Sequence, residues 1–259
     1  MKRLLALVLA GLMVFALAGC GKEEVETYEF KVGFDAEYPP YGYMDDDGSY
    51  TGFDLELAEA VCELNGWEMK YVPIDWNAKD MELESGNIDC IWSGFTINGR
   101  EDLYAWSDPY VENSQVVVVA SESGIADLAG LSGKVVGVQS GSAALSLLED
   151  EEGQKELADT FSELREFADY NTAFAELMAG TIDALAMDIG VAKYQVSSRG
   201  EGYEILDEYL NEEQYGIGFR LDDTELRDDV QEAVDTLKEN GKFDELAEKY
   251  DLADLVISE

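Results

Sequence analysis

One arginine and one aspartate, far apart in the chain, stand where two apolar stretches end. Arg100 follows residues 88–94 in the run Thr-Ile-Asn-Gly-Arg, and Asp188 closes residues 182–188. The planar fork of an arginine suits a carboxylate, and a lone carboxylate suits an ammonium group. Together these two residues predict a site for an α-amino acid. The simpler alternatives are a surface ion pair for Arg100 and a turn-forming role for Asp188.

Five other side chains of suitable type follow predicted strands or open predicted helices. Thr96 offers a hydroxyl group and a backbone N–H. Ser142 starts a helical stretch, where free N–H groups favour an anion, or it serves only as the helix cap. Tyr38 and Trp76 could clamp a ligand side chain between their rings, or could be core aromatics. Asp35 follows the first predicted strand and could reach the polar end of a ligand.

Alternating strand and helix patterns would position these residues. The sequence predicts strands at residues 30–35, 68–74, 88–94, 134–141, 163–169 and 182–188, and residues 115–121 form an apolar run that bridges to the second series. It predicts helices at residues 53–66, 79–86, 142–150 and 171–180, and two more within residues 224–250. This order is typical of a parallel sheet covered by helices. In such sheets ligands bind beyond the carboxyl ends of the strands.

The chain also repeats one short pattern. Residues 82–89 and 176–183 both read Glu-Leu-x-x-Gly-x-Ile-Asp. Each copy predicts the end of a helix, a glycine cap and the start of a strand. The repeat therefore predicts two similar α/β lobes. Residues 94–100 and Asp188 would then face one cleft from opposite lobes.

Composition limits the partners of the protein. The 259 residues are 46% apolar and 11% aromatic, which is enough for one large or two modest domains. There are 57 acidic residues against 17 Lys and Arg, and the net charge of −40 would repel DNA and RNA. We therefore expect no nucleic-acid partner. Mixed stretches such as residues 148–159 and 222–246 hold much of the acid and predict solvated helix faces.

The absence of histidine excludes several kinds of chemistry. Ser-His and Cys-His catalysis and the usual zinc and iron sites all need it. We expect no metal and no cofactor. Residues 45–48, Asp-Asp-Asp-Gly, lack the spacing of a calcium loop and predict a hairpin turn. Cys62 and Cys90 are either small core residues or a disulfide.

The N-terminal segment predicts export. A basic pair precedes residues 4–19, which are uncharged, too short for a spanning helix and rich in small residues at the end. The run Leu-Ala-Gly-Cys ending at Cys20 resembles a bacterial lipobox, which implies a signal peptide at residues 1–19 and lipidation of Cys20. Residues 20–27 would form a tether. The alternative is an ordinary signal peptide. We expect an extracytoplasmic protein, lipid-anchored to a bacterial membrane at the cell surface or in the periplasm.

Taken in order, these motifs resemble the extracellular solute-binding proteins of polar amino-acid ABC transporters (family 3), a group with glutamine-, arginine- and cystine-binding members. The similar stretches cover nearly the whole mature chain and include GFDAEYPPYGY, GNIDCIWSGFTINGRED, GTIDALAMD and EQYGIGF. The resemblance implies a two-lobed periplasmic-binding-protein-like α/β fold of type II. Lobe 1 would take residues 28–115 plus 214–259 and lobe 2 residues 116–213, with hinge crossings near 116–120 and 211–215.

The same resemblance implies roles for individual residues. The arginine matching Arg100 holds the ligand α-carboxylate, helped by the residues matching Gly94, Thr96 and Ser142, and the aspartate matching Asp188 holds the α-ammonium. Aromatic residues sandwich the ligand side chain. The expected ligand-binding residues are Asp35, Tyr38, Trp76, Ser93, Gly94, Thr96, Arg100, Gln139, Ser142 and Asp188.

Three features depart from the family pattern. The connection between Thr96 and Arg100 is one residue shorter than usual. Gln139 and Met187 stand where glutamine binders carry lysine and histidine, so a strict glutamine site is not supported. Asp35 would suit a cationic or an amide side chain. The sequence therefore predicts a polar amino acid without naming it.

We accordingly expect a monomeric capture protein that is not an enzyme. A polar L-amino acid would bind one lobe and gain contacts to the other on closure, so binding would shift the population toward the closed form. That form would dock on the transmembrane subunits of an ABC permease. One alternative is an amino-acid sensor on the same fold. A less favoured alternative is a dehydratase, which would need Asp35 or Glu37 as its acid or base.

Overall fold

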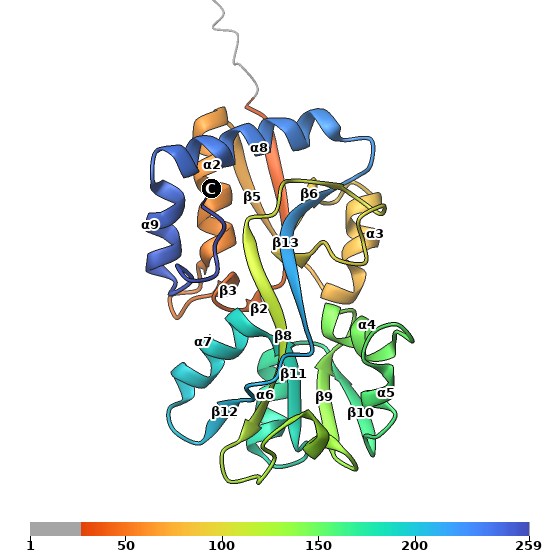
Figure 1. Ribbon diagram of the computed structural model, residues 1–259. Helices are drawn as coiled ribbons and strands as arrows, with labels where there is room; N and C mark the ends of the chain where they lie inside the picture. The colour runs from red at the N-terminus through yellow and green to blue at the C-terminus, as the bar shows by residue number, and fades with distance from the viewer. Residues whose placement is uncertain (1–26, 259) are drawn as a thin grey trace, which may run out of the picture.

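The computed structural model describes residues 27–258, whose apolar stretches form one ten-stranded sheet (Figure 1). Every strand predicted from the sequence is present. The ten strands are β1 (Glu29–Phe34), β5 (Glu68–Pro73), β6 (Cys90–Thr96), β7 (Ala105–Trp106), β8 (Val111–Ala120), β9 (Val135–Gln139), β10 (Glu163–Phe167), β11 (Ala184–Asp188), β12 (Tyr203–Ile205) and β13 (Asn211–Phe219). A small second sheet holds β2 (Glu37–Tyr38), β3 (Gly42–Met44) and β4 (Tyr50–Thr51).

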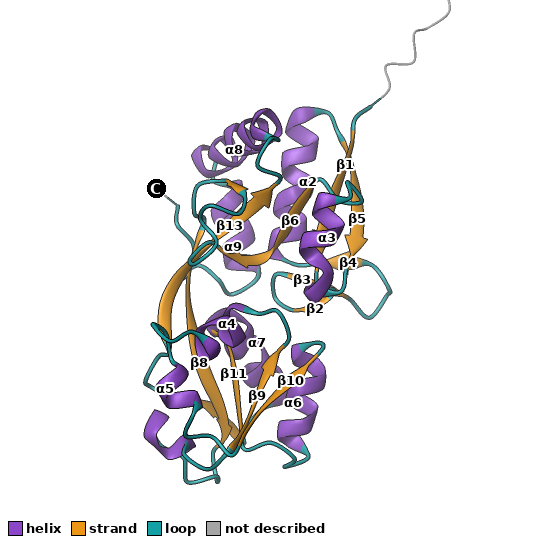
Figure 2. Ribbon diagram, turned by 90° about the vertical axis from the view of Figure 1, so that its right-hand side faces the viewer, coloured by secondary structure: helices purple, strands orange, loops and turns teal. Residues whose placement is uncertain are grey.

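The predicted helices are also present, and α5 and α7 are additional. The helices are α2 (Phe53–Asn65), α3 (Lys79–Glu84), α4 (Ala143–Glu149), α5 (Lys155–Ala158), α6 (Tyr170–Met178), α7 (Ile189–Arg199), α8 (Thr224–Glu239) and α9 (Lys242–Lys249). Helices α2, α3, α8 and α9 lie in the upper part of Figure 1 together with β1, β5 and β6, whereas α4 to α7 lie in the lower part together with β9, β10 and β11; Figure 2 shows the same grouping. The elements therefore form two α/β lobes.

Two long strands join these lobes. The sheet runs β10-β9-β11-β8-β13-β6-β1-β5. The outer arms contain the parallel pairs of β1 with β5 and β6, and of β9 with β10 and β11. In the middle, β8 and β13 run antiparallel to each other and pass from one lobe into the other (Figure 2). The predicted two-lobed fold with two connecting strands is confirmed.

The repeated sequence pattern has the same structure in both lobes. Gly86 and Gly180 follow α3 and α6 with φ of 77° and 70°, a region that glycine adopts without strain. The aspartates that end the two copies also match. Asp89 Oδ2 accepts a hydrogen bond of 2.8 Å from a backbone N–H of β1, and Asp183 Oδ2 accepts one of 2.8 Å from β9. Each aspartate ties the strand that follows it to the first parallel strand of its lobe.

Two alternatives left open by the sequence have clear outcomes. The Asp-rich run between β3 and β4 is a hairpin turn, in which the N–H of Gly48 donates to the carbonyl of Asp45 over 2.9 Å. Cys62 and Cys90 are buried, and neither is in a disulfide. Both behave as small core residues.

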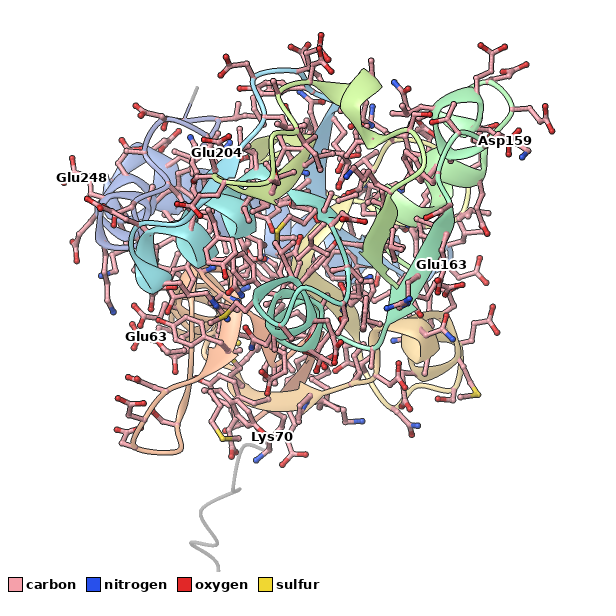
Figure 3. The ribbon with its side chains drawn as sticks, turned by 90° about the horizontal axis from the view of Figure 1, so that it is seen from below. Glu63, Lys70, Asp159, Glu163, Glu204 and Glu248 are labelled. Carbon is pink, nitrogen blue, oxygen red and sulfur yellow. The ribbon has the colours of Figure 1, made fainter. Side chains whose placement is uncertain are left out.

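Many acidic side chains lie on the outside of the molecule, as the charge pattern predicts. In α8, for example, the buried residues Val230, Ala233, Val234 and Leu237 recur at helical spacing and leave the acidic face to solvent. Seen from below, labelled carboxylates on both lobes point outward (Figure 3). These exposed residues are Glu63, Asp159, Glu163, Glu204 and Glu248.

The predicted signal peptide and the lipobox cysteine, Cys20, lie outside the described residues. Within residues 27–258, no helix combines the length and the apolar character needed to cross a bilayer.

Candidate functional site

A narrow cavity of about 10 Å³ lies between the lobes, at the ends of β6, β9 and β11. Its lining residues are Tyr38, Trp76, Gly94, Thr96, Arg100, Gln139, Ser142, Ala143 and Asp188. All of these except Ala143 were predicted from the sequence. The two remaining predicted residues lie next to the lining, because Asp35 accepts a hydrogen bond from Gln139 and donates its own N–H to Ser93 Oγ. The structure therefore brings all the predicted residues together.

Arg100 has free donors at one end of this cavity. Among residues 27–258 it makes no ion pair with a carboxylate, so the surface ion-pair alternative is wrong. Its Nη1 donates to the carbonyl of Thr96 over 3.1 Å, and the guanidinium lies 5.3 Å from the ring centroid of Phe95. These contacts hold the side chain and leave most of its N–H groups for an anion.

The short connection before Arg100 forms a tight turn. The N–H of Arg100 donates to the carbonyl of Ile97 over 2.8 Å, and Gly99 has a φ of 77°. Asn98 Oδ1 accepts a hydrogen bond of 2.8 Å from the backbone of Gln214 in β13. The connection between Thr96 and Arg100, one residue shorter than usual, therefore forms a turn that is bonded to the connecting strand β13.

For Ser142, Tyr38 and Trp76 the sequence left open a structural role or a place in the site, and the structure shows both. Ser142 Oγ accepts the N–H of Leu145 over 3.1 Å as the cap of α4, and Ser142 also lines the cavity. Tyr38 and Trp76 are 5% and 8% exposed and belong to the core clusters, yet both line the cavity. Each of these three residues therefore has a structural role and also lines the cavity.

Asp188 marks the other charged end of the cavity. Its Oδ1 accepts hydrogen bonds from Asn113 Nδ2 (2.8 Å), Gln115 Nε2 (2.7 Å) and the hydroxyl of Tyr215 (2.7 Å). It caps no helix N–H, so the turn-forming alternative does not describe it. Burial, followed by the charge of nearby Glu213, raises the pKa of Asp188 to about 6. A bound cation would compensate the cost of this buried charge.

Glu213 is a buried carboxylate that sequence reasoning missed. It lies on β13, is 4% exposed, and accepts a hydrogen bond of 2.8 Å from the hydroxyl of Thr96. It also lines an adjoining cavity of about 400 Å³ that shares Arg100 and Ala143 with the first. The only available signal was the alternation of strand residues, which cannot by itself choose between Glu213 and Glu212.

The third region of the cavity presents hydrogen-bond acceptors. Gln139 Nε2 donates to Asp35 Oδ2 over 2.6 Å and to the carbonyl of Ala168 over 3.2 Å. Both N–H groups of the amide are thereby used, and only its oxygen remains for a ligand. Asp35 Oδ1 accepts the N–H of Glu37 over 2.9 Å. Burial raises the pKa of Asp35 to about 6, so the carboxyl group is mostly ionised at neutral pH.

A lysine that the sequence did not single out bridges the lobes. Lys79 is 6% exposed, and its Nζ donates to the carbonyls of Gly141 (3.2 Å) in lobe 2 and Trp76 (3.4 Å). Burial, followed by the charge of Arg100, lowers the pKa of Lys79 to about 8. The residue therefore adds positive potential on the Arg100 side of the cavity.

Gly94 is held by another residue missed from the sequence. Its N–H donates to Asp54 Oδ2 over 2.7 Å, while Asp54 Oδ1 accepts the hydroxyl of Tyr110 over 2.8 Å. Gly94 has a φ of 53°, and a Cβ there would lie 2.7 Å from the ring of Tyr38 and 3.0 Å from that of Tyr215. Only glycine fits this close approach, and the fully buried Asp54 fixes its backbone.

Comparison with known proteins gives a consistent result over almost all of the described chain. The family model of bacterial extracellular solute-binding proteins, family 3, matches residues 30–253. The arginine-binding extracellular protein ArtP of Bacillus subtilis is 31% identical over 258 residues, which cover 96% of this chain and 98% of that protein. The L-cystine-binding protein TcyJ of Escherichia coli is 28% identical over 253 residues, with 96% and 92% covered.

Solved structures agree with this result. An ABC uptake transporter substrate binding protein from Streptococcus pneumoniae with bound histidine matches with a TM-score of 0.82 at 34% identity, covering 86% of this chain and 92% of that chain. An ancestral arginine-binding protein bound to glutamine matches with a TM-score of 0.77 at 34% identity, covering 86% and 98%.

Proposed function

The chain belongs to the bacterial extracellular solute-binding proteins, family 3, and we propose that it captures a polar L-amino acid between its lobes and delivers it to an ABC permease in the membrane. The similar proteins named above are binding proteins, so this chain is a binding protein and not an enzyme. As a member of this extracellular family, the protein acts outside the cytoplasm.

One observation carries the proposal: Arg100 and Asp188 lie in the wall of the same small cavity with opposite charges. The free donors of Arg100 suit an α-carboxylate, and the buried carboxylate of Asp188 suits an α-ammonium group. Thr96 and Ser142, which carry hydroxyl groups, line the same cavity. An α-amino acid satisfies both charges at once, whereas a neutral sugar or a simple anion would leave at least one of them buried and unpaired.

The side-chain end of the site favours a ligand that donates hydrogen bonds. Asp35 and the remaining oxygen of Gln139 are both acceptors. An acidic ligand side chain would place a second carboxylate against Asp35, which is unfavourable in a buried site. We therefore infer a preference for a cationic or amide side chain over aspartate and glutamate. Tyr38 and Trp76 would enclose the aliphatic part of that side chain.

Closure of the lobes would occur about the two connecting strands. We assign lobe 1 to residues 28–115 plus 214–259 and lobe 2 to residues 116–213, with crossings near 116–120 and 211–215. Strands β8 and β13 run through these positions. Three side-chain contacts between the lobes support a closed arrangement: Gln139 with Asp35, Lys79 with Gly141, and Asn171 with Glu37. A ligand touching both lobes would favour this state over an open one.

The N-terminal sequence adds the proposal of a lipid anchor on Cys20, with residues 20–27 as a tether. The anchor would keep a captured ligand close to the permease. Replacing Cys20 with serine should release the mature protein from the membrane fraction of the expressing bacterium. Retention of that variant in the membrane fraction would exclude anchoring through Cys20.

A thermal-shift screen tests the function as a whole. The mature protein is heated with each of the twenty common L-amino acids, ornithine and cystine. A ligand at one hundred times its dissociation constant should stabilise the protein by about 2.7 kcal/mol. We expect the largest shifts from ligands with cationic or amide side chains. Absence of a shift with every compound would contradict the proposed function.

A further inference from the structure

Two amide side chains join Asp188 to Glu213. Asn113 Nδ2 donates to Asp188 Oδ1 over 2.8 Å and to Glu213 Oε1 over 2.7 Å. Gln115 Nε2 donates to the same two oxygens over 2.7 Å and 2.8 Å. The two carboxylate oxygens therefore share both donors. They must lie close to each other, on either side of a pair of NH₂ groups.

Strand register produces this arrangement. Asp188 of β11 stands opposite Gln115 of β8, and Glu213 of β13 stands opposite Asn113 of β8. Residues 113 and 115 are two apart on one strand, so their side chains point to the same face of the sheet. The central strand thus presents two amides that hold a carboxylate from each neighbouring strand.

No cation balances these two carboxylates within the described part of the chain. Asp188 and Glu213 are 3% and 4% exposed, and neither makes an ion pair there. Their remaining hydrogen bonds come mainly from uncharged groups, including the hydroxyls of Thr96 and Tyr215. A second carboxylate next to Asp188 in a buried site disfavours the ionised form of Asp188.

Resting on the function proposed above, we propose that Asp188, beside the carboxylate of Glu213, holds a proton in the ligand-free site at mildly acidic pH, and that the α-ammonium group of the bound amino acid displaces it. The ligand enters with its ammonium group already protonated, and the displaced proton leaves to solvent. No covalent bond to the ligand forms or breaks. Glu213 acts through Asp188 and is a positioning residue that links ligand capture to pH.

The other groups around Asp188 agree with this exchange. Burial and the neighbouring Glu213 raise the pKa of Asp188 to about 6, and burial holds the pKa of the surrounding tyrosines well above their usual range, so these hydroxyls stay neutral. An ammonium group next to Asp188 would lower its pKa again. Ligand affinity should therefore be full above pH 7 and should fall as the pH drops through about 6. The titratable and charged groups facing Asp188 or lining the same cavity are Tyr38, Tyr41, Tyr170, Tyr215, Glu213 and Arg100.

Titration calorimetry in buffers of different ionisation enthalpy tests the exchange directly. The mature chain is titrated with L-arginine, L-histidine and L-glutamine at pH 6 and at pH 8. With L-glutamine, whose uncharged side chain places no cation beside Asp35, the wild type should release about 0.5 proton for each ligand bound at pH 6, near the midpoint of the titration of Asp188, and almost none at pH 8. The wild-type measurement requires no variant, so it tests the proposal even if a substituted chain folds poorly.

Glu213→Gln separates the role of Glu213 from simple burial of Asp188. This variant keeps the shape and an acceptor oxygen, and it removes the neighbouring charge. Its proton release at pH 6 should fall below half that of the wild type, and the acid limb of its affinity profile should move to lower pH. Glu212→Gln is the matched control, since Glu212 is exposed on the same strand, and it should behave as the wild type.

The outcomes distinguish this inference from the proposed function. Binding of a probe at pH 6 without proton release would overturn the proton exchange and leave amino-acid capture intact. Equal proton release by Glu213→Gln and the wild type would overturn the role of Glu213. Binding of none of the three probes at either pH would instead count against the proposed function, on which the inference rests.

Discussion

The amide of Gln139 in lobe 2 donates a 2.6 Å hydrogen bond to the carboxylate of Asp35 in lobe 1, across the boundary between the lobes. Both side chains are buried, at 1% and 7% exposed. The bond closes the side-chain end of the cavity with residues from two lobes. It therefore couples recognition of the ligand to closure, because the acceptors that would meet the ligand are assembled only when the lobes meet.

Replacing Gln139 with leucine should weaken binding by removing this coupling. Leucine keeps the approximate size of the side chain and leaves the buried carboxylate of Asp35 without its cross-lobe donor. The loss of one partner of a buried hydrogen bond costs about 1–3 kcal/mol, which corresponds to a roughly 5- to 150-fold loss of affinity by calorimetry. Asn171→Ala is the control, because its contact with Glu37 is exposed and also joins the lobes. Equal effects of the two variants would show that burial of the bond is unimportant.

Arg100→Ala should remove most of the affinity. The substitution leaves the α-carboxylate of the bound ligand without its counterpart, and breaking a buried pair costs about 3–5 kcal/mol. Arg100→Lys should recover only part of this, since an ammonium group cannot form the planar fork. Affinity for the amino acid is measured by calorimetry.

Arg165→Ala is the matched control for this prediction. Arg165 is bonded to Glu163 on the exposed face of β10, and its removal should leave ligand affinity unchanged. Near-normal affinity of Arg100→Ala would exclude Arg100 as the carboxylate-binding residue.

Residues that could be placed from the sequence stand at the ends of strands. Arg100 and Asp188 follow apolar stretches whose type and order are clear, and parallel strands of one sheet end at a common edge. The repeated Glu-Leu-x-x-Gly-x-Ile-Asp pattern then placed the two ends in different lobes. Local sequence was sufficient for these residues, because their position depends on where a strand ends and only weakly on what packs beside it.

Residues missed from the sequence depend on packing between distant segments. Glu212 and Glu213 are identical in type and adjacent, and only the register of β13 against β8 turns Glu213 inward. Asp54 resembles an ordinary acidic residue in the first turn of a helix, and its role appears when Gly94, forty residues later, meets it. Lys79 resembles a solvated lysine in an acidic chain until lobe 2 covers it. Their roles follow from tertiary structure that no local pattern encodes.

Lys79→Met should make the closed state less stable. Methionine retains much of the aliphatic stem and removes the Nζ that bonds to the carbonyl of Gly141 in the opposite lobe. We expect faster ligand dissociation in stopped-flow measurements, with little change in the association rate, because the contact forms only on closure. The matched control is Lys70→Met, whose charge pairs with exposed acids within lobe 1. An unchanged dissociation rate for Lys79→Met would show that the contact does not hold the lobes together.

Asp54 should affect ligand binding and the pH dependence of stability in separable ways. Burial raises the pKa of Asp54 to about 7 in the folded protein, above its ordinary value of 3.8. Between these two pH values the folded state binds more protons than the unfolded state, so this group makes stability fall as pH rises from about 4 to 7. Asp54→Asn removes that titration and can still accept the N–H of Gly94. The melting temperature of Asp54→Asn minus that of the wild type should increase from about pH 4 to 7 and then stay constant. Ligand affinity should be retained.

Asp54→Ala completes the test, because it removes the acceptor as well as the charge. Gly94 then loses the bond that fixes its backbone beside Tyr38, so affinity should fall even where the variant remains folded. Asp46→Asn, in the exposed hairpin turn, should change neither the affinity nor the shape of the melting profile. A melting profile of Asp54→Asn parallel to that of the wild type from pH 4 to 8 would mean that Asp54 is ionised throughout. Normal affinity of a folded Asp54→Ala would mean that Gly94 needs no such anchor.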